Sequence, residues 1–205
     1  MYIPSGQVWL TRIAEAMRRN RVLSITHQGF GKPEPSTFEI EPYFLKVVKR
    51  RWYVVARSPY YSERNRREGI KPEDVYLVYA LDRISDIRDT DKSFKMKKDF
   101  DVNRYFEGCC GVITSDEPVR RIVLLAYEHA ADYLRTLPLH ESQREIEGDD
   151  ESTLFEYHLK PTLDFYQLVL AQGDQVEVLE PETVREEMRN FAKNMLDYYT
   201  GQEDK

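Results

Sequence analysis

Apolar positions near the start of the chain follow a helical period and then change to the alternating period of strands. Trp9, Ile13, Ala16 and Met17 recur at helical spacing, which predicts a helix over residues 6–19. Five stretches rich in β-branched and aromatic residues follow, separated by glycine, proline or charged turns. They predict strands over residues 22–28, 37–41, 43–48, 52–58 and 75–81. One helix followed by five strands is the order of an Sm-like, SH3-type small β-barrel, whose closure removes exposed sheet edges.

The segment 59–73 interrupts this pattern with charge. It carries Arg64, Arg66 and Arg67 and almost no aliphatic residues, so we expect a loop that cannot pack into a core. Two interpretations remain open for such a loop. It is either solvated or ordered by a ligand.

The second half of the chain predicts a different fold. Residues 89–117 indicate a connector with one helical turn near 102–106. Beyond the connector, strand-like and helix-like patterns alternate in the order β-α-β-β-α-β of a ferredoxin-like arrangement. The predicted strands span 119–126, 143–146, 154–159 and 175–179, and the predicted helices span 128–135 and 162–171. We therefore expect an α+β protein with a barrel module over 1–88, a connector over 89–117 and a ferredoxin-like extension over 118–205.

A final helix is predicted after Pro181. Glutamates occupy its early turns, as the helix dipole prefers. Its apolar stripe runs over four turns. The stripe consists of Val184, Met188, Phe191, Met195 and Tyr198. Such a stripe packs either on its own domain or on a partner in a dimer, and both remain open.

The strand near residues 50–57 combines aromatic residues with arginines. Because side chains alternate along a strand, Trp52, Val54 and Ala56 share one face, which we expect in the core. The opposite face places a phenol between two guanidinium groups. Its residues are Arg51, Tyr53, Val55 and Arg57. This face suits a nucleotide, a short nucleic acid or a phosphorylated small molecule. The alternative is an edge strand with solubilising arginines.

Charge and composition narrow the possible functions. The chain has 205 residues, 41% hydrophobic content and a net charge of −6, but residues 1–88 carry +6 and residues 89–205 carry −12. Positive potential is therefore confined to the half that bears the aromatic strand. No apolar run approaches the roughly 20 residues that span a bilayer, and the N-terminus lacks a signal pattern. We expect a cytoplasmic protein without a membrane partner.

Catalytic and metal-binding patterns are missing from the sequence. The four histidines show no metal-ligand spacing, and we find no nucleophile elbow, P-loop or glycine-rich dinucleotide turn. The adjacent Cys109 and Cys110 indicate reduced thiols rather than a disulfide or a metal site. We expect no enzyme activity, no cofactor and no metal.

Three motifs resemble a known family. Ile-Glu-Pro-Tyr-Phe-Leu at 40–45, Arg-Trp-Tyr-Val at 51–54 and Leu-Asp-Arg-Ile at 81–84 closely resemble the WYL domain of bacterial transcriptional regulators. Residues 131–143 and 176–181 resemble the extension that commonly follows this domain. The chain departs from the motif at Val54, where the usual residue is leucine, and at His27, where the family often has tyrosine.

The resemblance implies an Sm-like fold and the function of an effector-sensing and dimerisation module of a regulator. We expect one basic concavity in the barrel that binds a nucleotide-derived or single-stranded nucleic-acid effector. Its lining residues are His27, Tyr53, Arg57 and Arg83, with Arg51 and Arg64 at the rim. We expect a homodimer that meets promoter DNA only through a helix-turn-helix domain absent from this chain. The alternatives are an Sm-like protein acting directly on RNA and an uncharacterised enzyme.

Overall fold

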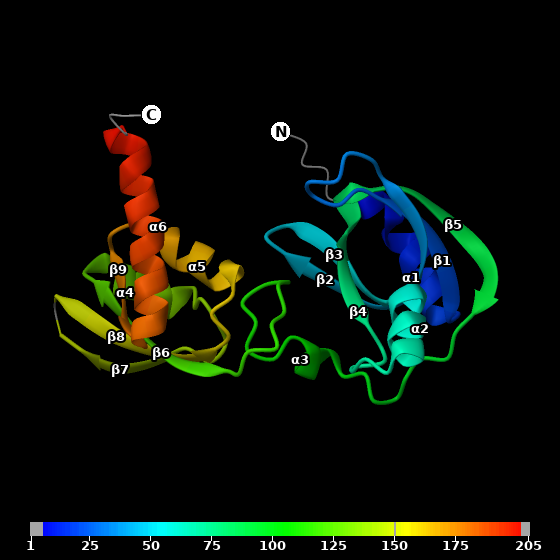
Figure 1. Cartoon of the computed structure of the whole chain (residues 1–205). Helices are drawn as coiled ribbons and strands as arrows, with labels where there is room; N and C mark the ends of the chain where they lie inside the picture. Colours follow the sequence, from blue (N-terminus) through cyan, green and yellow to red (C-terminus); the bar gives the residue numbers. More distant parts are fainter. Residues whose placement is uncertain (1–5, 150, 202–205) are drawn as a thin grey trace. The chain divides into compact units, whose positions relative to one another are not determined.

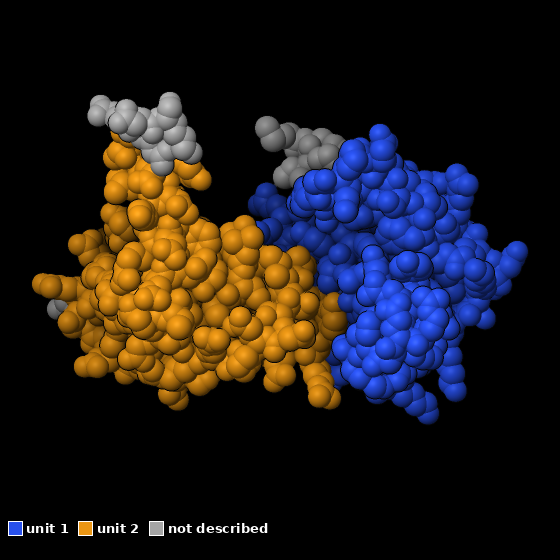
Figure 2. Space-filling view, viewed as in Figure 1, with its two compact units in different colours: residues 1–102 blue, residues 103–205 orange. Residues whose placement is uncertain are grey.

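The computed structural model describes residues 6–149 and 151–201. The chain divides into two compact units, with residues 1–102 in unit 1 and residues 103–205 in unit 2 (Figure 2). Each unit has its own hydrophobic core, and the two cores share no residue. Within the described ranges, none of the helices combines the length and apolar character that a membrane crossing requires.

Unit 1 is a five-stranded antiparallel sheet with helix α1 packed on one of its faces (Figure 1). Its strands are β1 (Arg21–His27), β2 (Ser36–Val48), β3 (Arg51–Arg57), β4 (Tyr76–Ala80) and β5 (Ile84–Ser93). Its helices are α1 (Leu10–Arg18), α2 (Pro59–Glu68) and the 3-10 turns η1 (Gln7–Trp9) and η2 (Leu81–Arg83). The strands lie in the order β4-β3-β2-β1-β5.

The core of unit 1 lies between α1 and the alternate apolar residues of the sheet. Ile13 of α1 is fully buried there with Ile25 of β1 and Val54 of β3. Trp52 packs against the same core and is partly buried. The core face predicted for this strand from alternation is therefore confirmed.

The five strands form an open sheet, so the closed barrel expected from the sequence is not formed by the described residues. β4 and β5 are the edge strands. The strands expected at 37–41 and 43–48 are one strand, β2, whose first half pairs with β1 and whose second half pairs with β3. The ladder with β3 shifts register at Pro42, because proline cannot donate to a ladder and a bulge accommodates it.

Helix α2 occupies most of the segment that we expected to be a charged loop. The Ser58 side chain accepts a hydrogen bond from the backbone N–H of Tyr61, Pro59 stands at the first turn, and Gly69 ends the helix in the left-handed region. Its buried residues, Ser62 and Asn65, are polar. The loop prediction was wrong because this helix has no apolar stripe.

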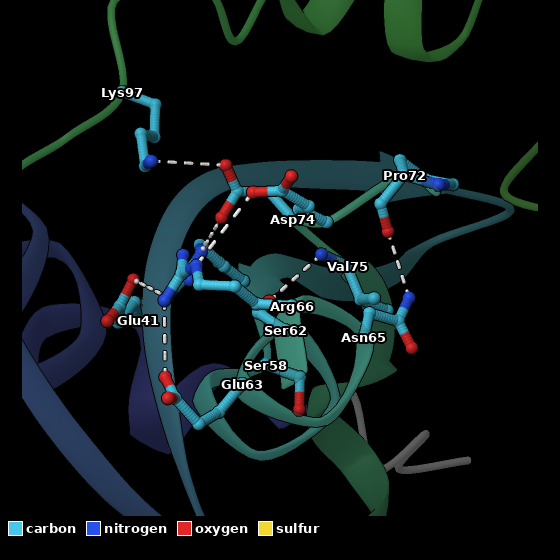
Figure 3. A network of polar contacts seen from close by, with 12 residues as sticks. Glu41, Ser58, Ser62, Glu63, Asn65, Arg66, Pro72, Asp74, Val75 and Lys97 are labelled. Atoms are coloured by element: carbon cyan, nitrogen blue, oxygen red, sulfur yellow. Dashed lines mark hydrogen bonds and ion pairs between the residues drawn. The ribbon is translucent and has the colours of Figure 1, made fainter. Parts of the chain in front are cut away.

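Polar bonds hold α2 to the segment before β4. Ser62 Oγ accepts from the backbone N–H of Val75 at 2.9 Å, and Asn65 Nδ2 donates to the carbonyl of Pro72 at 2.9 Å (Figure 3). These bonds satisfy buried polar groups of the helix and of the segment before β4.

Unit 2 shows the predicted order of elements after a short helix, α3 (Val102–Tyr105) (Figure 1). Its strands are β6 (Arg120–Tyr127), β7 (Arg144–Gly148), β8 (Ser152–Leu159) and β9 (Val176–Glu180). Its longer helices are α4 (His129–Thr136), α5 (Leu163–Leu170) and α6 (Glu182–Thr200). The antiparallel sheet has the order β7-β8-β6-β9. The mixed helix and strand content expected from the sequence is confirmed.

Helix α6 uses only its first half to pack on unit 2. Val184 is buried in the core, Met188 packs against it, and the Phe191 ring lies 5.5 Å from the ring of Tyr166. The second half carries large apolar side chains that are exposed within the described structure. They are Met195, Leu196, Tyr198 and Tyr199, with exposed fractions of 45%, 60%, 81% and 89%.

Candidate ligand-binding site

The candidate site lies in unit 1, where the end of β1 meets η2. His27 pairs with Ile84, the first residue of β5, and the backbone N–H of Gln28 donates to the carbonyl of Arg83 at 3.1 Å. Trp9 Nε1 donates to the carbonyl of Ile84 at 3.0 Å. Backbone pairing and a core tryptophan therefore fix the segments that carry the site.

His27 is a buried histidine that packs against two aromatic rings. It is 9% exposed, and its ring centroid lies 5.4 Å from that of Tyr79 and 6.5 Å from that of Phe38. Burial lowers the pKa of His27, the charge of Arg83 lowers it further, and Asp82 opposes both. The ring is therefore neutral at pH 7, so one of its nitrogens donates and the other accepts.

Asp82 pairs with one arginine of the site and precedes the other in sequence. Its Oδ2 lies 2.6 Å from Nη2 of Arg51, which extends from β3. Arg83 follows directly in η2, and its Cζ lies 4.0 Å from the centroid of the Phe30 ring. The site therefore combines two guanidinium groups, one carboxylate and one neutral imidazole.

The most informative feature of the site is a set of buried polar atoms. Four buried side-chain atoms in the described part of the chain have no hydrogen-bond partner, and three of them belong to residues of this site. They are His27 Nε2, Asp82 Oδ1 and Arg83 Nε. Each buried polar atom without a partner costs about 1–3 kcal/mol. The three atoms mark a region whose buried polar groups the protein itself does not fully satisfy.

A cavity of about 490 Å³ adjoins Asp82 and Arg83. Gln28 to Lys32 and Pro35 line it from the β1–β2 loop, and Asp82 to Ser85 line it from η2 and β5. Its volume lies within the range of small-molecule sites, roughly 300–1,000 Å³.

The structure brings some of the predicted site residues together. His27 and Arg83 lie at the site, and Arg51 reaches it through Asp82. Tyr53 is half-buried on β3 opposite Ala80, the residue before η2. Three of the six predicted residues, His27, Arg51 and Arg83, therefore lie at this site or reach it, and Tyr53 is placed near it only by its pairing with Ala80.

Arg57 lies at the opposite end of this ladder. It pairs with Tyr76, four residues along β3 from Tyr53, a separation of about 13 Å at strand spacing. Its guanidinium donates to Glu41 at 3.0 Å and to Asp74 at 2.6 Å. The single concavity expected to contain both Arg57 and Arg83 is therefore not formed.

Arg64 also lies away from the site. It is half-exposed on α2, 3.8 Å from Glu68, with its Cζ 5.4 Å from the centroid of the Tyr61 ring. We expected Arg64 at the rim because we expected residues 59–73 to form a loop. Because α2 forms instead, Arg64 contacts Glu68 and Tyr61 of the same helix.

Arg57 is the buried centre of an ion-pair network, which we call the Arg57 network. It consists of Glu41, Arg57, Asp74 and Lys97, and Figure 3 shows Glu41, Asp74 and Lys97 in it. Burial by itself would raise the pKa of Asp74, but hydrogen bonds from Arg57 and Lys97 outweigh it and lower this pKa. Asp74 therefore stays ionised and holds both cations at neutral pH.

Three residues of the site were missed by sequence reasoning: Phe30, Lys32 and Asp82. Asp82 stands inside the Leu-Asp-Arg-Ile motif, so its position beside Arg83 was available as a signal. Phe30 stands between Gly29 and Gly31, a pattern that usually marks an ordinary turn. Within residues 6–149 and 151–201, no group of three potential metal-ligand side chains occurs.

Family comparisons agree with this architecture. The WYL domain family matches residues 8–89, which include the whole candidate site. The WCX domain family matches residues 118–196, and the two matches together account for most of the chain. The chain belongs to the WYL-domain family. None of the curated proteins compared with it matches.

Two solved structures resemble the WYL–WCX chain. The Proteasome accessory factor B/C (PafBC) of Arthrobacter aurescens is 18% identical, with a TM-score of 0.36, and the match covers 98% of this chain and 28% of PafBC. A CRISPR Cas-related protein is 13% identical, with a TM-score of 0.51, over 97% of this chain and 53% of that protein. The chain thus spans about a quarter of the length of PafBC and about half of the length of the CRISPR Cas-related protein. The second likeness supports a shared fold.

The buried His27 predicts a pH-dependent stability of the WYL domain. An unfolded chain protonates His27 near its usual pKa of 6.5, but the folded domain does so only at lower pH. The unfolded state therefore binds more protons below pH 6.5, and the free energy of unfolding falls with decreasing pH. We expect His27→Gln to reduce this fall in urea titrations at pH 7 and pH 5. His129→Gln, a change at an exposed histidine, is the control. If the free energy of unfolding fell by the same amount between pH 7 and pH 5 in the wild type and both variants, the prediction would be contradicted.

Proposed function

We propose that the chain is the effector-sensing and dimerisation part of a bacterial transcriptional regulator. In this proposal His27, Arg51, Tyr53 and Arg83 bind a nucleotide-derived or single-stranded nucleic-acid effector. The observation that carries it is that Asp82 and Arg83, which line a cavity, each have a buried polar atom without a hydrogen-bond partner, as does the neighbouring His27. Promoter DNA would be contacted by a helix-turn-helix domain outside this chain.

The modules of this proposal keep the boundaries expected from the sequence, although β5 and unit 1 extend past residue 88. The WYL module spans 1–88, and the WCX module over 118–205 is assigned the ferredoxin-like arrangement, because four antiparallel strands in the order β7-β8-β6-β9 alternate with two helices. We assign unit 1 to the Sm-like fold in an open form. In support, η2 joins the two edge strands β4 and β5 within three residues.

Substitution of Arg83 tests the proposed binding site. We expect Arg83→Ala to weaken binding of an anionic effector by about 1.5–3 kcal/mol, because a shielded, charge-assisted contact is lost. Fluorescence anisotropy with a labelled thymidine pentamer, and competition by mononucleotides, measures the change.

Arg64→Ala is the matched control, since Arg64 lies on α2 and is 43% exposed. It removes the same charge from unit 1 and should change the affinity by less than about 0.5 kcal/mol. Equal losses in both variants would show a diffuse charge effect and would contradict a site at Arg83.

An Sm-like protein acting directly on RNA is the alternative function. Tyr60 and Tyr61 are exposed on α2 near several arginines, which favours it. However, Arg64 and Arg66 lie within 3.8 Å of glutamates, so part of their charge is neutralised. The same anisotropy assay, repeated with a short RNA oligomer, separates the two functions, because direct RNA binding would depend on α2 rather than on Arg83.

We also propose a homodimer whose contacts include the second half of α6. Its exposed apolar side chains continue the stripe that packs on unit 2, and a second copy can bury them. Light scattering should show a dimer that Tyr198→Glu shifts toward monomer. A monomeric wild-type chain would contradict this part of the proposal.

A further inference from the structure

Phe30 is a large aromatic residue held in an exposed position over the candidate site. Its side chain is 78% exposed, although one side of the ring lies 4.0 Å from the Cζ of Arg83. The same residue lines the 490 Å³ cavity. An arginine therefore supports the ring from one side while most of its surface stays accessible.

The loop between β1 and β2 is folded by its own hydrogen bonds. Gln28 Nε2 donates to the carbonyls of Lys32 and Pro33 at 3.2 and 3.4 Å, and the backbone N–H of Lys32 donates to the carbonyl of Gly29 at 3.2 Å. Gly31 has φ 70°, which glycine adopts without strain. Phe30 thus lies on a turn that hydrogen bonds within the loop hold in place.

The groups around Phe30 match different parts of a nucleotide. The flat, cation-backed ring suits stacking of a heteroaromatic base. Lys32 and Arg83, which also line the cavity, suit a phosphate. A sugar phosphate or inorganic phosphate would use these cations but would leave the ring of Phe30 without a contact.

We propose that Phe30 is the stacking platform for a nucleobase, so that the site selects base-containing ligands over sugar phosphates. This inference rests on the proposed function and names the ligand class of the same site. Phe30 would act by contact with the ligand, and Arg83 would act both on the phosphate and as the support of the ring.

The test compares ligands with and without bases on the full chain. The probes are a labelled thymidine pentamer against an abasic phosphodiester of equal length, and adenosine monophosphate against ribose 5-phosphate. We expect Phe30→Ala to weaken both base-containing probes by about 5- to 100-fold, the range measured for loss of one stacking contact, and to leave the abasic probes unchanged. Phe30→Trp should retain or improve binding, and a preference for pentamer or mononucleotide separates nucleic acid from nucleotide.

Tyr60→Ala is the matched control, because Tyr60 is a similarly exposed aromatic residue on α2. It should leave all four affinities unchanged. If Phe30→Ala weakened the base-containing and the abasic probes equally, or weakened neither, the stacking role would be overturned while the proposed function stands. Failure of the wild-type chain to bind any of the four probes would overturn the proposed function and this inference together.

Discussion

Arg57→Ala is expected to lower the free energy of unfolding of unit 1 by about 3–5 kcal/mol, because it leaves an ion-pair network without its buried central cation. Arg57 is 8% exposed, and its guanidinium lies between Glu41 and Asp74, whose side chains are also largely buried. Without it, Glu41 loses the partner of its ion pair, and Asp74 keeps only Lys97. Urea denaturation followed by tryptophan fluorescence measures the change, since Trp9 and Trp52, the two tryptophans, lie in unit 1.

Arg88→Ala is the matched control for this prediction. Arg88 also belongs to unit 1 and pairs with Asp86 at 2.7 Å, but its side chain is 79% exposed. Exposed ion pairs contribute about 0–1 kcal/mol, so the control should shift the transition little. If both variants lost a similar free energy of unfolding, burial of Arg57 would not determine how much its ion pairs stabilise unit 1.

The Arg57 network also explains how the chain after β5 is held to the sheet. Lys97 Nζ lies 3.2 Å from Asp74, and the backbone N–H of Lys97 donates to the hydroxyl of Tyr43 at 3.1 Å. The Tyr43 ring in turn lies 5.0–5.5 Å from the rings of Phe94 and Phe100. An arginine that looked like a ligand contact in the sequence therefore contributes to the scaffold of unit 1.

Elements with an apolar period were predictable from the sequence, and two elements without one were not. The buried residues Ser62 and Asn65 of α2 are polar, so periodicity gave no signal there. The cap residues Ser58 and Gly69 were the available signal. β5 was missed because Ile84 and Ile87 are its only buried residues, and charged side chains occupy much of its remainder. It extends past residue 88 into the expected connector.

The candidate site was predictable only as far as the motifs extend. The Leu-Asp-Arg-Ile motif and the end of β1 placed Arg83 and His27 together. Alternation put Arg51 and Arg57 on one face of β3 but could not show which carboxylates, distant in sequence, each would meet. Asp82 binds Arg51, whereas Glu41 and Asp74 bind Arg57. Those acidic partners decide which arginine lies at the site.

Phe165→Ala should destabilise unit 2 by about 3–5 kcal/mol and leave unit 1 folded. Phe165 is fully buried on α5 in the core of unit 2, and its truncation removes apolar contacts and leaves a cavity. Because the cores of the two units share no residue, the loss should stay within unit 2. Far-UV circular dichroism should then show unfolding at lower urea, while the tryptophan fluorescence of unit 1 keeps its wild-type midpoint.

Leu163→Ala, two residues earlier on the same helix, is the control for Phe165→Ala because Leu163 is 47% exposed. Its effect should be smaller, since surface substitutions usually change stability by about 0.5 kcal/mol or less. Binding of the thymidine pentamer should survive in Phe165→Ala, because His27, Asp82 and Arg83 all lie in unit 1. A fluorescence midpoint that falls together with the dichroism signal would instead show that the WYL and WCX units unfold as one cooperative body.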